Sequence, residues 1–262
     1  INVENYSYSN VSYVLRIERA TPILGIQMNN TNGTGEQSGT VLYLSFDENE
    51  SSYKAYDQSG YGNDGTWTGP NNATHNTSGR FGNALTFDGT DDFIDLGNDA
   101  SLNITDEITI EAWINPAATT HLGTILMAGN AFGDSYGIYQ RSPTDAQIAF
   151  FFNHNGTRYN LATGNLDIGA WNHIAGTYKD GNLKLYLDGV DAGGSVGSNT
   201  TTRNFVGIRI GHNVDPGYKF FNGTIDEVRI YNYSLSADEI NASARGIWND
   251  IPLTYPKAVN TS

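Results

Sequence analysis

The chain has 262 residues, no cysteine and a formal net charge of −14 at pH 7. The lack of cysteine excludes disulfide scaffolds, cysteine-ligated metal sites and thiol catalysis. The lysines and arginines form no cluster, and because binding to phosphates requires one, the composition disfavours nucleic acid and anionic membranes as partners.

The N-terminal region, residues 1–39, is predicted to be a strand segment followed by a polar linker. Apolar and polar residues alternate through residues 1–21, which indicates one or two strands. Residues 27–39 are mostly Asn, Thr, Gly, Gln and Ser, which is typical of a linker or long loop. The chain starts inside a strand-like segment, without Met or a signal-peptide pattern, so we expect an excised or mature piece of a longer protein.

The region from residue 40 to residue 245 contains short strand signals separated by Gly, Asn and Asp turns. The strand-like runs cover residues 42–46, 108–114, 148–152, 174–178, 183–187, 205–210 and 225–231. No apolar run approaches the roughly 18 residues of a membrane-spanning helix. This spacing predicts an all-β sandwich or jelly roll.

Local signals mark hairpins and one short helix. The pairs Asp180-Gly181 and Asp188-Gly189 follow strand-like runs and predict tight hairpin turns. Ser236 stands three residues before Glu239, which is the spacing of a capping box at a helix start. Residues 246–262 contain two prolines and are predicted to be a C-terminal linker.

Seven motifs then occur in a fixed order between residues 44 and 240. They are Leu44–Asp47, Asp57–Gly65, Gly79–Gly89, Ile110–Ile114, Trp171–Ala175, Leu185–Gly189 and Phe221–Tyr231, the last followed by Leu235-Ser236 and Glu239-Ile240. This ordered set resembles the laminin-G-like, concanavalin A-like jelly-roll domains of bacterial and archaeal surface proteins. The resemblance covers about residues 40–245, and it implies two antiparallel sheets and binding or adhesion rather than catalysis.

The resemblance also implies a structural calcium ion. Calcium takes six to eight oxygen ligands from carboxylates, carbonyls and water. The candidate ligands lie in three of the motifs and are Asp47, Asp57, Asn63, Gly65, Asp226 and Glu227. In strand numbering Asp226 shares a face with Val228 and Ile230, and an inward carboxylate is costly unless it is paired or bound to a metal. The alternative is that Asp226 pairs with Arg229 or Arg80.

Aromatic and polar residues in the predicted loops are candidates for a carbohydrate surface. Sugar sites combine an aromatic face with amides and charged groups that bind hydroxyls. The candidates are Trp67, Tyr136, Tyr139, Arg141, His154, Arg158, Tyr159, His212 and Tyr218. The alternative for each of them is an ordinary solvated loop residue.

Catalysis is not indicated. Glycosidases need two carboxylates that flank the scissile bond, roughly 5–10 Å apart. Glu107, Thr109 and Glu111 share a strand face, but the middle position lacks an acid, and the adjacent Asp226 and Glu227 are expected on opposite faces. No histidine lies in a nucleophile motif.

Sequons for N-glycosylation are unusually dense. The fourteen candidates are Asn5, Asn10, Asn29, Asn32, Asn49, Asn72, Asn76, Asn103, Asn155, Asn199, Asn222, Asn232, Asn241 and Asn260. A chain merely rich in Asn and Thr is the alternative. With the lack of cysteine, this density favours an extracellular cell-surface glycoprotein of a prokaryote, in particular an archaeon.

The sequence therefore predicts a non-catalytic extracellular module that binds Ca²⁺ and recognises glycans or partner surface proteins. The alternative is a structural subunit of a surface layer, sheath or filament. Residues 1–21 could then complete a sheet in a neighbouring copy.

Overall fold

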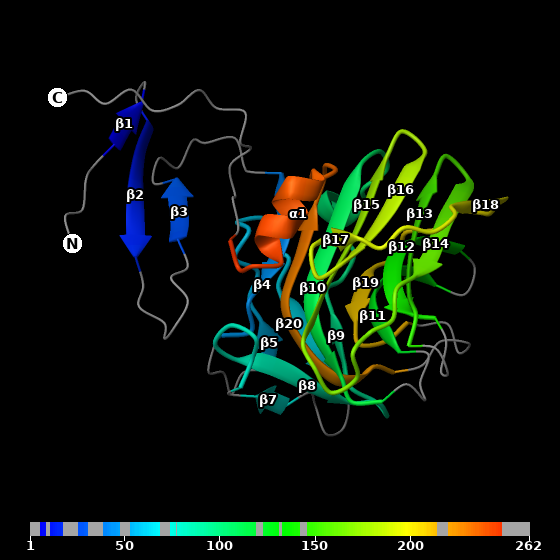
Figure 1. Cartoon of the computed structure of the whole chain (residues 1–262), viewed down its shortest axis with the longest axis horizontal. Coiled ribbons are helices and arrows are strands. Elements are labelled where there is room, and N and C mark those ends of the chain that lie inside the picture. Colours follow the sequence, from blue (N-terminus) through cyan, green and yellow to red (C-terminus); the bar gives the residue numbers. More distant parts are fainter. Residues whose placement is uncertain are drawn as a thin grey trace.

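The chain folds as a two-layered β-sandwich in a computed structural model (Figure 1). The structure describes residues 6–8, 11–17, 26–30, 39–47, 53–68, 74–76, 78–118, 123–130, 133–141, 146–213 and 220–247. The predicted all-β class is confirmed, because two antiparallel sheets and one short α-helix make up the described sandwich.

One layer is an eight-stranded sheet in the order β17-β16-β15-β10-β20-β8-β7, with β4 paired to β20. Its strands are β4 (Thr40–Leu44), β7 (Thr74–Asn76), β8 (Ala84–Asp88), β10 (Ile108–Pro116), β15 (Asn172–Lys179), β16 (Asn182–Leu187), β17 (Val190–Asp191) and β20 (Asn222–Tyr231). The long strands β10 and β20 pair antiparallel at its centre.

The other layer is a nine-stranded sheet in the order β18-β14-β13-β12-β11-β19-β9-β6-β5. Its strands are β5 (Lys54–Ala55), β6 (Gly65–Thr68), β9 (Phe93–Asp95), β11 (Thr124–Asn130), β12 (Gly133–Gln140), β13 (Ile148–His154), β14 (Thr157–Thr163), β18 (Gly197–Thr200) and β19 (Ile208–Ile210). The short helix η1 (Ala100–Leu102) follows β9 and is capped by Asp99.

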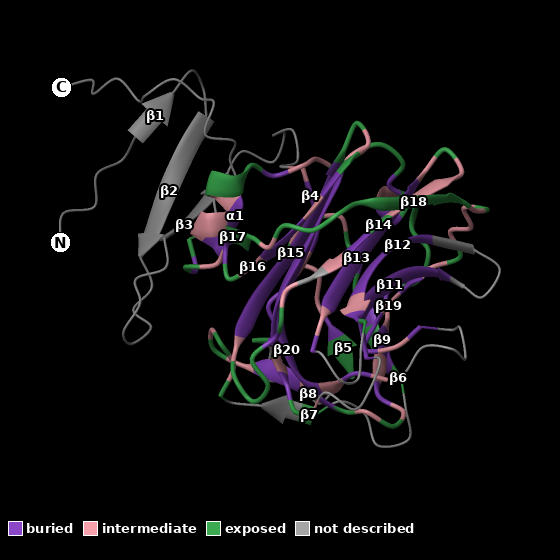
Figure 2. Ribbon diagram, turned by 45° about the vertical axis from the view of Figure 1, so that its right-hand side comes forward, coloured by how far each residue is buried: buried purple, intermediate pink, exposed green. Residues whose placement is uncertain are grey.

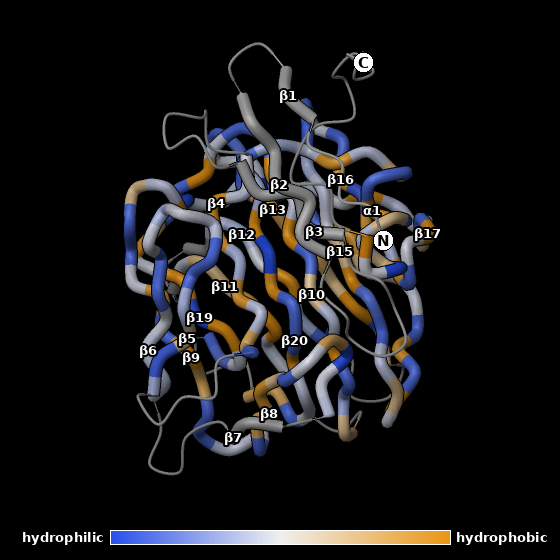
Figure 3. Tube along the Cα trace, turned by 90° about the vertical axis from the view of Figure 1, so that its left-hand side faces the viewer, coloured by the Kyte–Doolittle hydropathy of each residue, from blue (hydrophilic) through white to orange (hydrophobic). Residues whose placement is uncertain are grey.

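The main core fills the space between the two sheets. Alternate residues of each strand point inward, as their period of two requires, and hydropathy alternates along the strands (Figure 3). Ile110 and Leu185 of one sheet and Phe150 of the other belong to this core, and buried residues dominate the central strands (Figure 2). Full burial of such side chains stabilises the fold by roughly 1.5–3 kcal/mol each.

The predicted turns and helix cap are present. Asp180 and Gly181 have φ values of 48° and 79°, the left-handed pair that a two-residue hairpin loop requires. The Ser236 side chain accepts from the N–H of Glu239, and both halves of the capping box are formed at the start of α1 (Ala237–Ser243).

The helix α1 covers the outward side of the eight-stranded sheet. Ile240 of the helix belongs to a second apolar cluster with Tyr186 of β16 and Tyr231 of β20. The following Gly246 lies against the Phe81 ring. Among the described residues, no helix has the length and apolar character needed to cross a bilayer.

A separate three-stranded antiparallel sheet consists of β1 (Tyr6–Tyr8), β2 (Val11–Ile17) and β3 (Ile26–Asn30). Strands β1 and β2 match the expectation for residues 1–21. Strand β3 extends into the segment predicted as a linker. Its backbone pairs in register with that of β2, and composition does not reveal such an edge partner.

Candidate functional site

The sequence predicted that Asp226 faces the core, whereas in the structure it lies on the outward side of the eight-stranded sheet. Alternation places Asp226 with Val228 and Ile230, which are core residues. A β-bulge intervenes, because the register between β10 and β20 shifts beside Glu227, whose φ is 54°. The extra residue reverses the alternation, so Asp226 lies opposite Trp113 on the outward side of the eight-stranded sheet.

Although it faces outward, Asp226 is completely buried, because the loop at residues 78–83 covers it. The N–H of Phe81 donates to Asp226 Oδ2 at 3.0 Å. The Phe81 ring packs edge-on against Trp113 with centroids 5.8 Å apart, and Arg80 Cζ lies 4.3 Å from the Trp113 ring. The loop thus seals the carboxylate from water.

Asp226 belongs to a group of acids that lacks matching positive charge. Burial, then the charges of Glu227 and Asp47, raises the pKa of Asp226 to about 9. Glu227 is buried and pairs with Arg229 at 2.6 Å, so this cation is already engaged. Asp226 Oδ1 is buried and has no hydrogen-bond partner among the described residues. A buried carboxylate in this state is costly.

Asp47 joins Asp226 from the loop after β4. Its Oδ1 accepts the N–H of Asn83 at 2.8 Å, and its carbonyl accepts from the Asn83 side chain at 3.0 Å. Gly82 has a φ of 67°, and a Cβ there would collide with Asp47 Oδ1. Asp47 remains exposed as a whole residue, but partial desolvation of its carboxyl group against this loop raises its pKa.

The other predicted calcium ligands serve a different structure. Asp57 accepts from the backbone N–H groups of Tyr43, Ser59 and Asn63 and from the Ser59 hydroxyl, all within 2.9 Å. The Asn63 side chain is buried and donates to a carbonyl of β4 at 2.8 Å. Gly65 is buried in β6. The structure therefore brings together Asp47, Asp226 and Glu227. Asp57 and Asn63 instead fix the loop at residues 57–65 to β4 through hydrogen bonds.

The first group fits a hard divalent cation. Asp47 and Asp226 offer carboxylate oxygens beside a loop of backbone carbonyls, and these are the ligand types that calcium prefers. The unpartnered Oδ1 of Asp226 is the feature that a cation would satisfy. Glu227 is already paired with Arg229, so it would contribute negative charge near the cation rather than a ligand oxygen.

A further acidic group was not found by sequence reasoning. Carboxylate oxygens of Asp88, Asp91 and Asp92 lie within 4.8 Å of one another in the turn between β8 and β9. The close spacing of three aspartates at this turn is a signal in the sequence that could have found it. Groups of this kind occur commonly without a metal, and Asp92 Oδ2 accepts the N–H of Asp88 at 2.9 Å.

The outward face of the nine-stranded sheet is the second candidate surface. Cross-strand pairing defines one row of residues on this face, running from β6 to β14 through Thr66, Asp95, Arg209, Met127, Gly137, Phe151 and Asn160. Two of the predicted ligand residues flank the row. Arg158 Cζ lies 3.9 Å from the centre of the Phe151 ring, and the Tyr139 and Phe151 centroids are 6.3 Å apart. Arg141 is exposed just after β12.

Two predicted ligand residues lie in the core instead, which corrects the sequence prediction. Tyr136 is fully buried and its hydroxyl donates to the Leu102 carbonyl at 2.6 Å, while Trp67 is 7% exposed. Both occupy strands rather than loops, opposite the inward-facing Phe152 and Ile94. Neither ring is free to stack on a ligand.

The remaining predicted ligand residues are scattered. His154 Nδ1 lies 2.8 Å from the Thr105 carbonyl oxygen, and Tyr159 packs on Tyr178 with centroids 5.2 Å apart. His212 stacks on Phe220 at 3.8 Å. Tyr218 lies outside the described residues.

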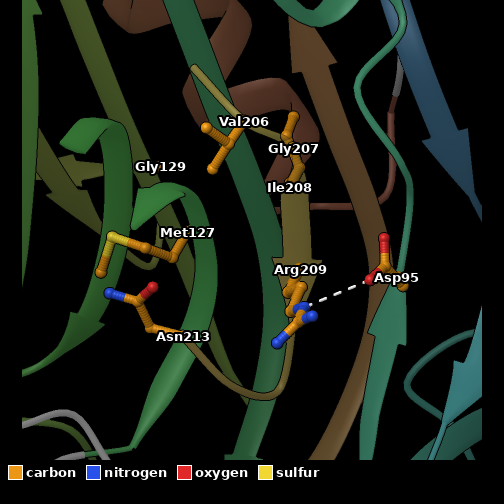
Figure 4. A pocket seen from close by; sticks show the side chains of 8 residues that line it. All are labelled: Asp95, Met127, Gly129, Val206, Gly207, Ile208, Arg209 and Asn213. Carbon is orange, nitrogen blue, oxygen red and sulfur yellow. Dashed lines mark hydrogen bonds and ion pairs between the residues drawn. The ribbon is translucent and has the colours of Figure 1, made fainter. Parts of the chain in front are cut away.

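A pocket opens within the outward row, where β9, β19 and β11 lie side by side (Figure 4). Met127 and Asn213 lie on one side of it, and Arg209, whose Nε donates to Asp95 Oδ2 at 3.2 Å, lies on the other. Val206 contributes an apolar wall. Sequence reasoning missed Asp95 and Arg209, because only strand pairing makes them neighbours.

Catalytic carboxylates are not apparent in the part of the chain that the structure describes. Glu111 is 1% exposed, accepts from the Tyr231 hydroxyl at 2.8 Å and lies 3.5 Å from His173. The acid on which a two-carboxylate reaction would depend is therefore enclosed in a polar cluster.

Several sequon asparagines are accessible. Exposed residues are Asn103, Asn155, Asn199 and Asn232, and partly exposed ones are Asn222 and Asn241. The side chains of the other candidates lie outside the description.

A profile described as the concanavalin A-like lectin/glucanases superfamily (Laminin_G_3) matches residues 88–241, and the chain belongs to this family. No curated protein sequence matches the chain.

Solved structures share the fold. Domain 4 of AbnA, an extracellular GH43 arabinanase from Geobacillus stearothermophilus in complex with arabinotriose, has a TM-score of 0.62 and 22% identity, covering 78% of this chain and 98% of that one. The receptor-binding domain of botulinum neurotoxin mosaic serotype C/D has a TM-score of 0.59 and 15% identity, covering 80% and 52%. A Trypanosoma rangeli sialidase has a TM-score of 0.57 and 20% identity, and the match covers 80% of this chain and 33% of the sialidase. The chain thus spans nearly all of the arabinanase domain, about half of the toxin domain and a third of the sialidase. At these identities the likeness is one of fold.

Proposed function

We propose that this chain is a non-catalytic extracellular recognition module that binds glycans or partner surface proteins and carries a structural calcium ion. The fold supports a binding role, because similar structures include an arabinanase domain in complex with arabinotriose and a toxin receptor-binding domain. Some of these similar structures belong to glycosidases, and the burial of Glu111 is the feature of this chain that favours binding over hydrolysis.

The observation that carries the calcium part is the unpartnered, fully buried Oδ1 of Asp226 beside Asp47. A bound divalent cation would supply the positive charge that these carboxylates lack. It would hold the loop at residues 78–83 against the outward face of the sheet, where the Phe81 ring packs on Trp113.

The ligand-binding part rests on the outward face of the nine-stranded sheet. Tyr139, Arg158 and Asn160 lie there together, and they combine an aromatic ring with polar groups as carbohydrate sites do. The density of N-glycosylation sequons supports an extracellular location, and the lack of cysteine favours a prokaryotic source.

The test has two parts. A glycan array and a cell-surface pull-down would be read against a control sandwich domain of the same family, and binding above the control supports the proposal. Thermal unfolding would be followed in calcium, in magnesium and in chelator. Binding in neither assay, or an unfolding temperature unaffected by calcium, would contradict the corresponding part.

The alternative is a structural subunit that assembles through its N-terminal strands. It is favoured by the sheet of β1, β2 and β3, which is separate from both sheets of the sandwich. Deleting residues 1–30 and measuring assembly by light scattering distinguishes the two ideas. A recognition module keeps its ligand after the deletion, whereas a filament subunit loses polymerisation.

A further inference from the structure

The pocket beside Arg209 is small and can hold only part of a ligand. Its volume is about 60 Å³, which at roughly 15 Å³ for each water centre holds about four waters. Arg209 and Asp95 form one wall and Met127 and Asn213 the other (Figure 4). The pocket therefore offers hydrogen-bonding groups and an apolar surface to the same occupant.

Asn213 provides the strongest sign that an occupant is missing. Its side chain is 1% exposed, and its Nδ2 has no hydrogen-bond partner among the described residues. A buried donor left without an acceptor is costly, and native structures rarely keep one. A hydroxyl or ring oxygen placed in the pocket would accept from it.

Arg209 is held in place before any ligand arrives. Its Nε donates to Asp95 Oδ2 at 3.2 Å, and its Cζ lies 4.5 Å from the centre of the Phe93 ring. These two contacts fix the guanidinium plane on two sides. Within the described part of the chain, its terminal nitrogens donate no hydrogen bond, so they remain available without a cost of ordering.

The pocket has no net charge. The Arg209 and Asp95 charges cancel, and the neighbouring His212 is neutral above about pH 5 because burial, and then Arg209, lowers its pKa to about 4. His212 stacks on Phe220 with centroids 3.8 Å apart and an interplanar angle of 9°. The whole chain has a charge of −14, which repels polyanions.

We infer that this pocket is a subsite for one residue of a neutral oligosaccharide, with Asn213 and Arg209 donating to sugar oxygens. The inference rests on the proposed glycan-binding function. Phe151 lies three strands away in the same row, a distance of roughly 14 Å at the usual strand spacing. The Phe151 ring is itself buried, so a ligand there would meet the partly exposed Arg158 and Tyr139 that flank it. An oligosaccharide laid across the strands reaches both these side chains and the pocket, and a monosaccharide does not.

The experiment uses the full chain and a panel of neutral arabino-, xylo-, gluco-, galacto- and manno-oligosaccharides with matched oligogalacturonates. Binding is measured by calorimetry at low and high salt. For the neutral glycan that binds, Asn213→Ala and Arg209→Ala are expected to weaken affinity about tenfold or more, which is the usual effect of losing one buried hydrogen bond. Arg245→Ala, at an exposed arginine of the C-terminal region, is the matched control and leaves affinity unchanged.

The outcomes separate the two proposals. Wild-type protein that binds a neutral glycan with no effect of either pocket variant overturns the subsite and leaves the proposed function standing. Preference for oligogalacturonate with strong salt dependence overturns the neutral-sugar inference. Absence of any glycan binding contradicts the glycan-binding part of the proposed function, and with it this subsite. Arg209→Lys, at a side chain 28% exposed, covers the case in which Asn213→Ala does not fold, and it is also expected to lose affinity.

Discussion

Single residues decide the chemistry of the acidic group under the loop at residues 78–83. Asp226 combines complete burial with an oxygen that lacks a partner among the described residues. Glu227, its neighbour in sequence, is also a buried carboxyl group, yet Arg229 lies 2.6 Å from it. Two adjacent carboxylates thus differ in their need for a cation, because only one of them has an ion pair.

Asp226→Asn should separate the effects of calcium from those of burial. At pH 7 the folded wild-type protein without calcium holds a proton that the unfolded chain releases, because burial raises the pKa of Asp226 to about 9. That difference destabilises the fold as pH rises from about 4 to about 9. In chelator the variant is therefore expected to unfold at the same temperature as the wild type or higher.

In calcium the wild type should instead unfold at a higher temperature than Asp226→Asn. Saturation at 100-fold the Kd stabilises the wild type by ~2.7 kcal/mol, or roughly 5–10 °C in a domain of this size. The variant should gain little. Thermal unfolding of both proteins with calcium and with chelator measures this, with the exposed Asp167→Asn as control. An equal calcium effect in wild type and variant would rule out Asp226 as a ligand.

His212 should make the protein less stable in acid. Burial, then the charge of Arg209, lowers its pKa to about 4 in the folded state, whereas the unfolded value is about 6.5. Between these values the unfolded chain binds more protons, so stability is lost as pH falls from about 6.5 to about 4.

His212→Phe keeps a ring to stack on Phe220 and removes the titration. The fall in unfolding temperature between pH 6.5 and pH 4 should be smaller in this variant than in the wild type. Parallel pH profiles for wild type and His212→Phe would show that the acid sensitivity arises elsewhere.

At the scale of single elements, the loop at residues 78–83 requires glycine at position 82 for two reasons. Its φ of 67° is strained for other residues, and a Cβ would meet the Asp47 carboxylate. Gly62 has a similar φ of 78° and no atom within 4 Å of a built Cβ. Substitution of Gly62 therefore tests backbone strain alone, whereas substitution of Gly82 tests strain together with the steric contact to Asp47.

Gly62→Ala should cost only the strain of a left-handed conformation, about 1–2 kcal/mol. Gly82→Ala should cost that amount plus ~1–3 kcal/mol of overpacking, and it should also abolish the calcium-dependent rise in unfolding temperature. Denaturant titrations with and without calcium measure both effects. If the two variants behave alike, the contact between Gly82 and Asp47 has no role in the site.

The capping box of α1 is a local device with a structural consequence. Ser236→Ala removes the acceptor for the Glu239 N–H and should cost ~1 kcal/mol, which lowers the unfolding temperature by about 2–4 °C. Ser198→Ala, on the exposed strand β18, is the control. A null effect at Ser236 would mean that Ile240 packing alone holds the helix.

At the scale of the whole molecule, the spacing between the sheets depends on small residues facing large ones. A Cβ at Gly176 of β15 would collide with the ring of Phe150 from the other sheet. Since interiors are close-packed, one added methyl group must push the layers apart or force a strained rotamer.

Gly176→Ala is therefore expected to destabilise the entire sandwich by ~1–3 kcal/mol, as measured by denaturant unfolding. Gly197→Ala is the matched control in β18, because the nearest atoms there belong to the movable Asn160 side chain. Glycan affinity of the folded Gly176→Ala protein should stay near the wild-type value. An unchanged free energy of unfolding in Gly176→Ala would show that the core has unfilled space at this contact.

The sequence by itself determined the features that local chemistry controls. Period-two alternation in runs such as Leu183–Leu187 specified strands, the Asp180-Gly181 pair specified a hairpin because both residues adopt positive φ, and Ser236 with Glu239 specified the helix start. The motifs also singled out Asp47 and Asp226, which the fold brings together, and their role as calcium ligands stays a prediction.

Only the tertiary structure decided which faces and neighbours these residues have. The bulge at Glu227 turned Asp226 outward, strand pairing enclosed Tyr136, and the pairing of β9, β19 and β11 brought Asp95, Arg209 and Met127 to one pocket. The physical reason is that alternation fixes only relative sides along one strand. One inserted residue reverses them, and long-range pairing sets which strands are adjacent.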